Sequence, residues 1–457
     1  MQVIKIYNAN KGQKLVLEPI QPGVVRMYVC GMTVYDLCHI GHARVMVFFD
    51  VVARFLRYSG YSVNYVRNIT DVDDKIIARA QENSVDITTL TEQYISEMHQ
   101  DELSLGNLSP DHEPKASEYI PEMINLIEKL LSKHHAYIGE TGVVWFDVKS
   151  YADYGHVSGQ DIATLMSDVR KDMSKNKKDP LDFCLWKLAK EGEPAWPSPW
   201  GHGRPGWHIE CSAMASHFLG FSVDIHGGGI DLKFPHHENE SAQSSCAFDA
   251  DYVRSWVHVG HVTDKTEKMS KSLGNFITIR DALKTVRGEA IRYLLLTSHY
   301  RQPLPFDTAN LQQADKAICR FYRVLTTYPP TKTNKECQYV KDFMAAMQDD
   351  FNTVKAFSVC FEMVKAAYKQ EDHDLSCIIS ANLRYVLQII GFALDQPERY
   401  LMGTHSISDS EIKNLIERRK VARSEQDWQL ADKIRDDLLL EGVVLEDGPS
   451  GTKWRSG

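Results

Sequence analysis

The fold can be predicted from the segment Val24-Val25-Arg26-Met27-Tyr28-Val29. Its β-branched and aromatic residues are typical of a buried strand in a parallel sheet. A helical pattern follows from Ala43 to about Tyr58, and the run from Tyr61 to Ile69 predicts a second strand. Strand–helix–strand units of this kind form right-handed parallel crossovers. We therefore expect an α/β protein, with nucleotide sites beyond the carboxyl ends of the strands.

The loop after the first strand carries two histidines. It runs through Cys30-Gly31-Met32-Thr33 to His39-Ile40-Gly41-His42 and lacks the glycine-rich fingerprint of dinucleotide-binding proteins. A single histidine at a helix start is usually a cap or a surface residue. Two histidines around an Ile-Gly pair favour phosphate binding, because both can donate to phosphate oxygens at the positive end of a helix. Gly41 has no Cβ, so a flat base could lie against its backbone.

A second segment holds side chains that are metal ligands by type. Cys211 follows Gly206-Trp207-His208-Ile209-Glu210, and His236 and Glu240 stand further along the chain. A soft thiolate together with an imidazole suits zinc. His236 and Glu240 are four residues apart, so on a helix they share one face. The spacing is not that of a zinc finger, and a site with three ligands is either open or completed from elsewhere.

Length and composition are those of a soluble globular protein. The 457 residues are enough for roughly two to four domains. The net charge of −9 argues against a cationic nucleic-acid coat protein, but not against a local basic face. The nine scattered cysteines fit a reducing cytosol. With no secretory signal and no apolar stretch of about 18 residues, we expect a cytoplasmic protein without a membrane span.

The second half of the chain is predicted to be mainly helical. From about Leu311 to Met402 apolar residues recur at three-and-four spacing, which favours a helix bundle. Residues 408–440 predict two further amphipathic helices, and residues 443–455 predict two short strands around a turn. This last part reads as a small mixed domain of about fifty residues.

A polar loop, Lys268-Met269-Ser270-Lys271-Ser272, follows a strand predicted from Ser255 to Gly260. Two lysines three residues apart could hold a polyphosphate, although a short Lys/Ser segment is usually a solvated loop. Together with His39-Ile40-Gly41-His42, however, this loop matches the two signatures of class I aminoacyl-tRNA synthetases letter for letter. The chain therefore resembles that family.

Other segments are similar to the cysteinyl-tRNA synthetase branch of the family. They are Cys30–His42, Asn68–Lys75, Gly206–Met214 and His226–Glu240. Asp350–Thr353 and the tail Asp427–Arg455 resemble that branch's helical and anticodon-binding domains. The resemblance covers essentially the whole chain.

The resemblance implies a Rossmann-type parallel sheet split by an insertion, followed by an α-helical bundle and a small mixed α/β anticodon-binding domain. The implied parts are the first half of the catalytic domain (1–118), a connective insertion (119–205), the second half (206–262), the region of the Lys-Met-Ser-Lys-Ser loop (263–310), the helical bundle (311–403) and the anticodon-binding domain (404–457).

The implied reaction attaches L-cysteine to tRNA(Cys). ATP and cysteine first give cysteinyl-adenylate and pyrophosphate, and the cysteinyl group then passes to the 3′-terminal adenosine of the tRNA. One alternative is a ligase of mycothiol biosynthesis, which joins cysteine to an amino sugar; the tail argues against it. Another is a synthetase-like tRNA-binding protein without catalysis, which would usually show broken signatures.

By the resemblance, the fourth zinc ligand is Cys30, beside Cys211, His236 and Glu240, with one zinc per subunit. Cys38 lies near Cys30 and could compete for that place, but the family pattern favours Cys30. The zinc would bind the thiolate of the substrate and so distinguish cysteine from serine. We therefore expect no editing site.

The resemblance also implies the other site residues and partners. Catalytic roles fall to His39, His42, Lys268 and Lys271. ATP would contact Gly41, His42, Gly229, Asp231 and Lys271, and Mg2+ would accompany it. The cysteine pocket would include Gly31, Thr70 and Trp207. Anticodon contacts would come from Arg423, Trp428, Asp432 and Asp447. A monomer is expected.

Overall fold

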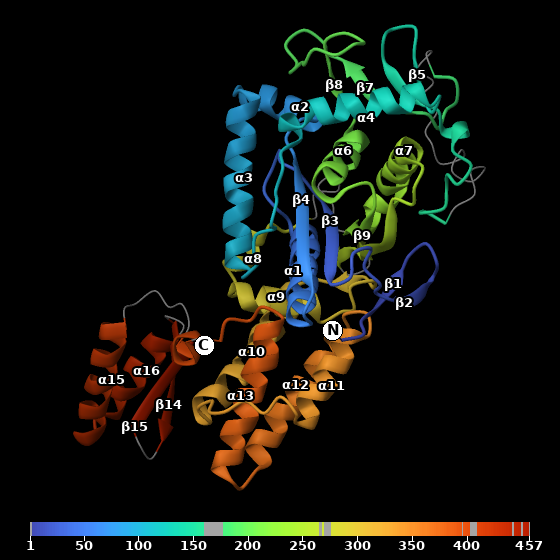
Figure 1. Ribbon diagram of the computed structural model, residues 1–457. Coiled ribbons are helices and arrows are strands. Elements are labelled where there is room, and N and C mark those ends of the chain that lie inside the picture. The colour runs from blue at the N-terminus through green and yellow to red at the C-terminus, as the bar shows by residue number, and fades with distance from the viewer. Residues whose placement is uncertain are drawn as a thin grey trace. The chain divides into compact units, whose positions relative to one another are not determined.

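The computed structural model describes residues 2–159, 177–264, 267–268, 276–394, 396–402, 409–440, 443–448 and 451–456. Its central element is a parallel four-stranded sheet in the order β10-β9-β3-β4 (Figure 1). The strands are β3 (Val24–Thr33), β4 (Ser62–Thr70), β9 (Val223–Gly229) and β10 (Val253–Val259). The predicted α/β architecture with a parallel sheet is confirmed.

The sheet joins two parts of the sequence that lie far apart. Tyr28 of β3 is paired with His226 of β9, and both side chains are fully buried. The strand order runs from β3 to β4 on one side and from β9 to β10 on the other. In open α/β sheets ligands bind where the order reverses, outside the carboxyl ends of the strands. A ligand site is therefore expected at the carboxyl ends of β3 and β9.

Helix α1 (Ile40–Tyr58) connects β3 to β4 and packs on this sheet through buried residues such as Phe49, whose ring lies against Gly227 of β9. It begins three residues before the predicted start at Ala43, because His39 caps it. The first strand is also longer than predicted and reaches Thr33, with irregular pairing between Val29 and Met32. The loop between β3 and α1 is therefore shorter than predicted and runs from residue 34 to residue 39.

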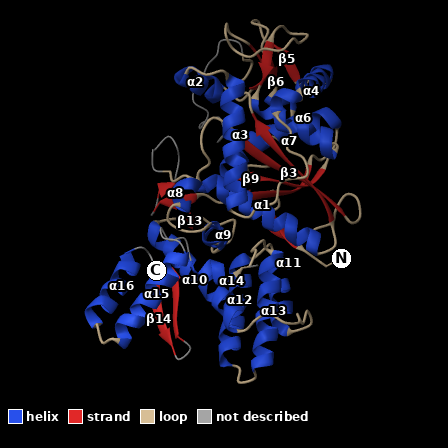
Figure 2. Ribbon diagram, turned by 90° about the vertical axis from the view of Figure 1, so that its left-hand side faces the viewer, coloured by secondary structure: helices blue, strands red, loops and turns tan. Residues whose placement is uncertain are grey.

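Between β4 and β9 the chain forms helices and a second sheet. The helices are α2 (Asp74–Asn83), α3 (Ile87–Ser104), α4 (Ile120–Ser132) and α6 (Trp207–Leu219). The strands β5 (Ala136–Ile138), β6 (Val144–Phe146), β7 (Phe183–Leu188) and β8 (Gly203–Pro205) form an antiparallel sheet beyond the carboxyl ends of the central strands (Figure 2). Strand β8 lies at the end of a stretch rich in Pro, Gly and Trp and pairs with β7.

The remaining elements are mostly helical, as predicted. They are β1 (Lys5–Asn8), β2 (Gln13–Val16), α7 (Glu238–Phe248), β11 (Val262–Asp264), β12 (Glu267–Lys268), α8 (Ile279–Leu283), α9 (Gly288–Leu296), β13 (Leu304–Pro305), α10 (Thr308–Thr327), α11 (Gln338–Gln348), α12 (Thr353–Lys369), α13 (His373–Ile389), α14 (Pro397–Met402), α15 (Asp409–Ser424), α16 (Trp428–Leu440), β14 (Val443–Gly448) and β15 (Gly451–Ser456).

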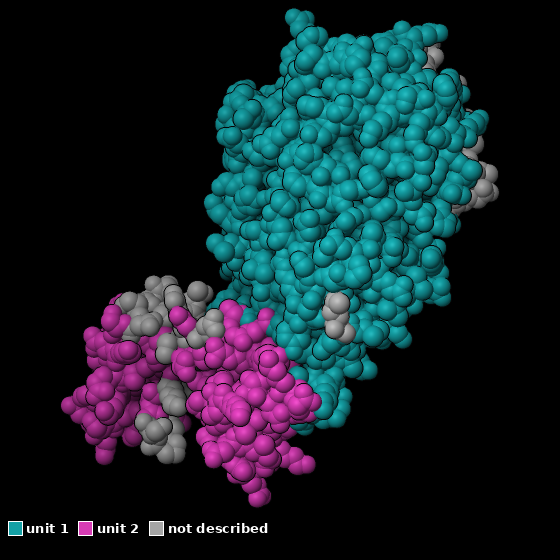
Figure 3. All heavy atoms as spheres, viewed as in Figure 1, with its two compact units in different colours: residues 1–315, 338–359, 389–392 teal, residues 316–337, 360–388, 393–457 magenta. Residues whose placement is uncertain are grey.

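The chain divides into two compact units (Figure 3). One comprises residues 1–315, 338–359 and 389–392, and the other 316–337, 360–388 and 393–457. Within the second unit, α15, α16 and the hairpin β14–β15 share a small core of Ile412, Ile434, Leu438 and Val443. Two helices and a hairpin were predicted for this part of the tail. Among the described residues, no helix is both long and apolar enough to cross a membrane.

Candidate active site and metal centre

A cavity of about 480 Å³ lies at the carboxyl ends of β3 and β9. Its walls come from the end of β3, the start of α1, the end of β9 and the residues after β10. The predicted site residues among its lining are Cys30, Gly31, His39, Gly41, His42, Trp207, Gly229 and Asp231. The structure thus brings into one cavity residues that are separated by up to about two hundred positions.

The two signature histidines form the N-terminal cap of α1. The backbone N–H of His42 donates to Nδ1 of His39 over 3.2 Å, and the backbone N–H of His39 donates to Nδ1 of His42 over 3.3 Å. Their rings are stacked, with centroids 3.6 Å apart. A Cβ on Gly41 would lie 2.8 Å from Cε1 of His39, so a side chain at this position would displace the His39 ring. The positive end of a 19-residue helix therefore faces the cavity together with two imidazoles.

Gly31 is required where β3 passes β4. A Cβ at this position would lie 1.6 Å from the carbonyl oxygen of Asn68, and the Gly31 N–H donates to the side chain of Asn68 over 2.8 Å. The Asn68 amide lies 3.3 Å from Oγ1 of Thr70, which donates to Glu210 over 3.0 Å. Thr70 is fully buried and lies behind Gly31, outside the lining of the cavity. A part for Thr70 in cysteine binding remains a prediction.

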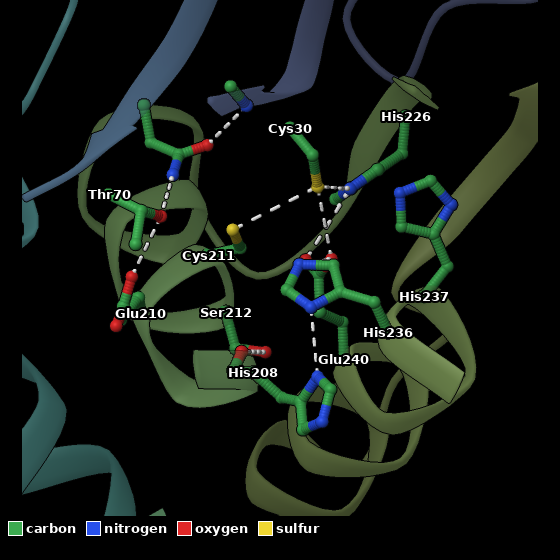
Figure 4. A network of polar contacts seen from close by, with 12 residues as sticks. Cys30, Thr70, His208, Glu210, Cys211, Ser212, His226, His236, His237 and Glu240 are labelled. Carbon is green, nitrogen blue, oxygen red and sulfur yellow. Dashed lines mark hydrogen bonds and ion pairs between the residues drawn. The ribbon is translucent and has the colours of Figure 1, made fainter. Parts of the chain in front are cut away.

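Four predicted zinc ligands converge beside the cavity (Figure 4). Cys30 stands near the end of β3, Cys211 on α6, His236 in the turn Lys233–His237 and Glu240 in the first turn of α7. One ligand atom from each lies within 4.8 Å of the others. Cys38 is elsewhere, with its Sγ 3.5 Å from Sδ of Met32. Of the two cysteines left open by the sequence, Cys30 is the one in the group.

The separations of these atoms fit tetrahedral zinc. A Zn–S distance of roughly 2.3 Å places two sulfurs ~3.8 Å apart, and Sγ of Cys30 is 3.9 Å from Sγ of Cys211. Nε2 of His236 is 3.1 Å from Oε1 of Glu240, where nitrogen and oxygen ligands of zinc would be ~3.3 Å apart. His236 and Glu240 face each other as their spacing predicted.

The ionisable groups of this set shift one another's pKa values strongly. Burial and the neighbouring Cys211 raise the pKa of Cys30, whereas the Cys30 thiol and His236 outweigh burial and lower the pKa of Cys211 to about 6. Burial alone would lower the pKa of His236, but Glu240 and Cys211 raise it to about 10. His226 and His236 outweigh burial and hold the pKa of Glu240 well below its ordinary value. Buried anionic ligands of this kind are stable when they coordinate a metal.

Three buried histidines next to the group were not assigned a role from the sequence. Nε2 of His226 lies 3.5 Å from Sγ of Cys30 and 3.4 Å from Oε2 of Glu240. Nδ1 of His237 lies 2.9 Å from Nε2 of His258. Cys30, His226, His237 and Glu240 form a second set with metal-ligand spacing. The only sign of such a role in the sequence is the position of His226 near the carboxyl end of a strand.

Trp207 and His208 pack on His236 from the start of α6. The ring centroid of Trp207 is 4.2 Å from that of His236, and its side chain is partly exposed to the cavity. Nδ1 of His208 lies 2.8 Å from Nδ1 of His236. Burial and the neighbouring His236 lower the pKa of His208 well below its ordinary value, which suits a neutral acceptor. Such a partner fixes the orientation of a ligating imidazole.

Gly229 and Asp231 lie at the end of β9. A Cβ on Gly229 would lie 2.4 Å from Oδ1 of Asp231, so the carboxylate closes over the glycine at the cavity wall. Of the second signature, the backbone of Lys268 is part of β12, which pairs with β11. Lys271 lies outside the described residues, so its role stays a prediction.

The predicted anticodon residues lie in the second unit. Trp428 starts α16 with 58% of its surface exposed. Asp432 pairs with Arg435 over 3.3 Å. Asp447 accepts two hydrogen bonds of 2.9 Å from Arg419 and one of 3.0 Å from Arg423. Arg419 is therefore a buried structural partner of Asp447.

Two family models match the chain. The model described as "tRNA synthetases class I (C) catalytic domain" matches residues 16–316. The model described as "DALR domain" matches residues 342–394. Together they cover the central sheet, the cavity and much of the following helical region.

Similar proteins agree with these matches. A cysteine–tRNA ligase of Shewanella amazonensis is 50% identical to the chain over 457 residues, covering 99% of this chain and 100% of the relative. A cysteine–tRNA ligase of Coxiella burnetii is 49% identical over 456 residues, covering 99% of both. Among solved structures, a methionyl-tRNA synthetase of Mycobacterium tuberculosis has a TM-score of 0.56 at 14% identity and covers 82% of this chain and 91% of its own. At that identity the likeness shows a shared fold.

Proposed function

The chain belongs to the cysteine–tRNA ligase family of class I aminoacyl-tRNA synthetases, and we propose that it activates L-cysteine with ATP and transfers it to tRNA(Cys). One observation carries the proposal. Two buried cysteines, a histidine and a glutamate converge beside the same cavity that receives the capped N-terminus of α1. A group that selects sulfur and a group that binds phosphate therefore share one site.

In the first step the nucleophile is the carboxylate of cysteine, which is already ionised and needs no general base. The residues have to position ATP and stabilise charge on the phosphate that is transferred. The N-terminus of α1, with the rings of His39 and His42, is assigned to the triphosphate. Lys268 and Lys271 are assigned to the pyrophosphate that leaves, with Mg2+ bound through phosphate oxygens.

Cys30, Cys211, His236 and Glu240 would hold the zinc, and the indole of Trp207 would close the cavity beside them. The zinc would supply a soft cation that favours a thiolate over a hydroxyl, which is the basis for selecting cysteine over serine. In this proposal the protein orients the substrate thiol toward the four ligands, and Gly31 lines the cavity beside them at the end of β3.

In the second step the 2′-hydroxyl of the terminal adenosine takes the cysteinyl group, as in class I enzymes. The tail, which carries the exposed Trp428, distinguishes this function from the mycothiol-pathway alternative. Intact signature residues and a complete ligand group favour catalysis over a role in tRNA binding alone.

The test is cysteine-dependent exchange of pyrophosphate into ATP, followed by charging of purified tRNA(Cys). We expect exchange that requires both cysteine and Mg2+, and cysteine attached to tRNA. Exchange without charging, combined with transfer to an amino sugar, would identify the mycothiol-type ligase. Binding of tRNA(Cys) without any exchange would identify a non-catalytic protein.

Replacing Trp428 by alanine should weaken charging while sparing exchange. Stacking of a base on an aromatic ring is worth about 1–3 kcal/mol, so kcat/KM for tRNA(Cys) should fall roughly 5- to 100-fold. Leu439→Ala is the matched control, since Leu439 lies on the same helix and is 55% exposed, close to the 58% of Trp428. Equal charging by both variants would show that Trp428 does not contact the tRNA.

A further inference from the structure

The loop that carries the signature histidines is paired with a segment more than two hundred residues later in the chain. The backbone N–H of Ile40 donates to the carbonyl of Ile277 over 3.0 Å, and the N–H of Ile279 donates to the carbonyl of Cys38 over 3.0 Å. His39 and Thr278 are opposite each other in this antiparallel bridge. The backbone position of His39 is therefore set by residues 277–279.

Side chains reinforce this pairing. Ile40 and Ile279 are both fully buried, so each end of the bridge is anchored in the core. The ring of Phe276 lies next to that of His39, with centroids 6.3 Å apart. Since the rings of His39 and His42 are stacked, a displacement of residues 276–279 would be passed to both histidines.

Arg280, the next residue, ties this segment to helix α3. Its guanidinium forms an ion pair with Glu97, a second with Oδ1 of Asp101 at 3.2 Å, and lies 3.4 Å from the side-chain oxygen of Gln100. Helix α8, on which it stands, has only five residues. A helix this short gains little stability by itself, so the attachment to α3 adds to the restraint given by its buried residues Ile279 and Ala282.

The partner carboxylate is buried, which makes the attachment specific. The side chain of Asp101 is 3% exposed, and its Oδ2 has no hydrogen-bond partner among the described residues. Burial and the neighbouring Glu102 raise the pKa of Asp101 to about 6, so Arg280 offsets only part of the cost of burying this carboxylate. Glu97 and Asp101 together fix the direction of the Arg280 side chain and so link α8 to α3.

We propose that Arg280 is a positioning residue for adenylate formation, which holds residues 277–279 against Cys38–Ile40 and thereby sets His39 and His42 toward the ATP triphosphate. This inference rests on the proposed function of the two histidines. The substrate thiol is assigned to a different group, built on β3, α6 and α7. The effect of Arg280 should therefore fall on ATP and not on cysteine.

The experiment compares Arg280→Ala with Lys284→Ala in the full-length holoenzyme. Lys284 caps the same helix, is 76% exposed in its side chain and pairs only with Asp281 among the described residues. In cysteine-dependent exchange, Arg280→Ala should lower kcat/KM for ATP by about 10- to 100-fold, because small displacements of catalytic groups have effects of this size. The KM for cysteine should change less than about twofold in Arg280→Ala. In Lys284→Ala, kcat/KM for ATP and the KM for cysteine should both change less than about twofold.

Amide hydrogen exchange gives a readout that does not require activity. Arg280→Ala should increase the exchange rate of the Ile40 and Ile279 amides by about tenfold or more, because both donate across the bridge. This result can be obtained even if the enzyme proves to use another amino acid, so failure of the inference and failure of the proposed function are distinguishable. Unchanged exchange of both amides would overturn the inference.

Glu97→Gln tests the same attachment from α3, where Arg280 itself is unaltered. It should also lower kcat/KM for ATP. The double variant with Arg280→Ala and Glu97→Gln should lose little more than Arg280→Ala alone. Independent, multiplicative losses would overturn the inference, as would equal changes in the constants for ATP and cysteine.

Discussion

Cys211→Ser is expected to deprive the protein of zinc and to lower cysteine-dependent pyrophosphate exchange by at least about 100-fold. Replacing sulfur by oxygen changes one donor atom and almost no volume, but a hydroxyl is a poor ligand for a soft site. Loss of a residue that merely supports a ligand typically costs about 10- to 100-fold in metal affinity or activity, so loss of a ligand should cost more. Metal content by mass spectrometry and the KM for cysteine are the measurements.

Cys246→Ser is the matched control for this experiment. Cys246 is also buried and lies on α7 with Glu240, but it is not part of the ligand group. It should retain one zinc per chain and an unchanged KM for cysteine. A Cys211→Ser protein that kept its zinc and its cysteine affinity would disprove the assignment.

Discrimination against serine provides a second measure of the same site. A pocket that selected by size alone would distinguish substrates that differ by one small group only about 10- to 200-fold. If a metal selects the thiolate, the wild-type protein should prefer cysteine by far more than this without any editing. Attachment of serine at a rate near that of cysteine would return the zinc to a structural role.

His42→Ala is expected to produce the second large effect, a fall of about 10²- to 10³-fold in kcat for adenylate formation. Losses of this size follow removal of one group that stabilises charge in a transition state. The exchange reaction should be measured at saturating cysteine with ATP varied. Since Nδ1 of His42 also accepts a hydrogen bond from the N–H of His39, a stability loss of about 1 kcal/mol should accompany the change.

His217→Ala is the control for stability and for histidine content. His217 lies on α6, is 44% exposed in its side chain and pairs with Glu122 over 3.4 Å. It should leave both exchange and charging within about twofold of the wild-type values. The activity of His42→Ala should be compared with its fraction of folded protein. If the two fell by the same factor, His42 would act only as a helix cap.

Local patterns predicted the elements that position the site. Strand β3, helix α1 and strand β4 follow from apolar periodicity, and the approach of His236 to Glu240 follows from their spacing. The beginning of α1 was placed too late, because a cap formed by two histidine side chains has no hydrophobic periodicity. Features that are set within a single helix or strand could be predicted from the residues of that element.

Long-range pairing could not be predicted in the same way. Cys30 entered the ligand group only through the family resemblance, since nothing near it in sequence indicates that β3 lies beside β9. The contacts of His226 and His237 depend on that same pairing. The ion pair between Asp447 and Arg419 likewise joins a strand to a helix, and no local pattern indicates it.

The ligand group also has a consequence for how the chain is synthesised and matured. Cys30 and Glu240 are 210 positions apart, and both are needed for the four-ligand set. At a synthesis rate of about 5–20 residues per second, roughly 10–40 seconds pass between the two residues on the ribosome. A zinc ion held by all four ligands would therefore bind only after both halves of the sheet have been synthesised, and it would link residues 210 positions apart. Since the entropic cost of closing a loop rises only slowly with its length, this long separation costs little more than a shorter loop would.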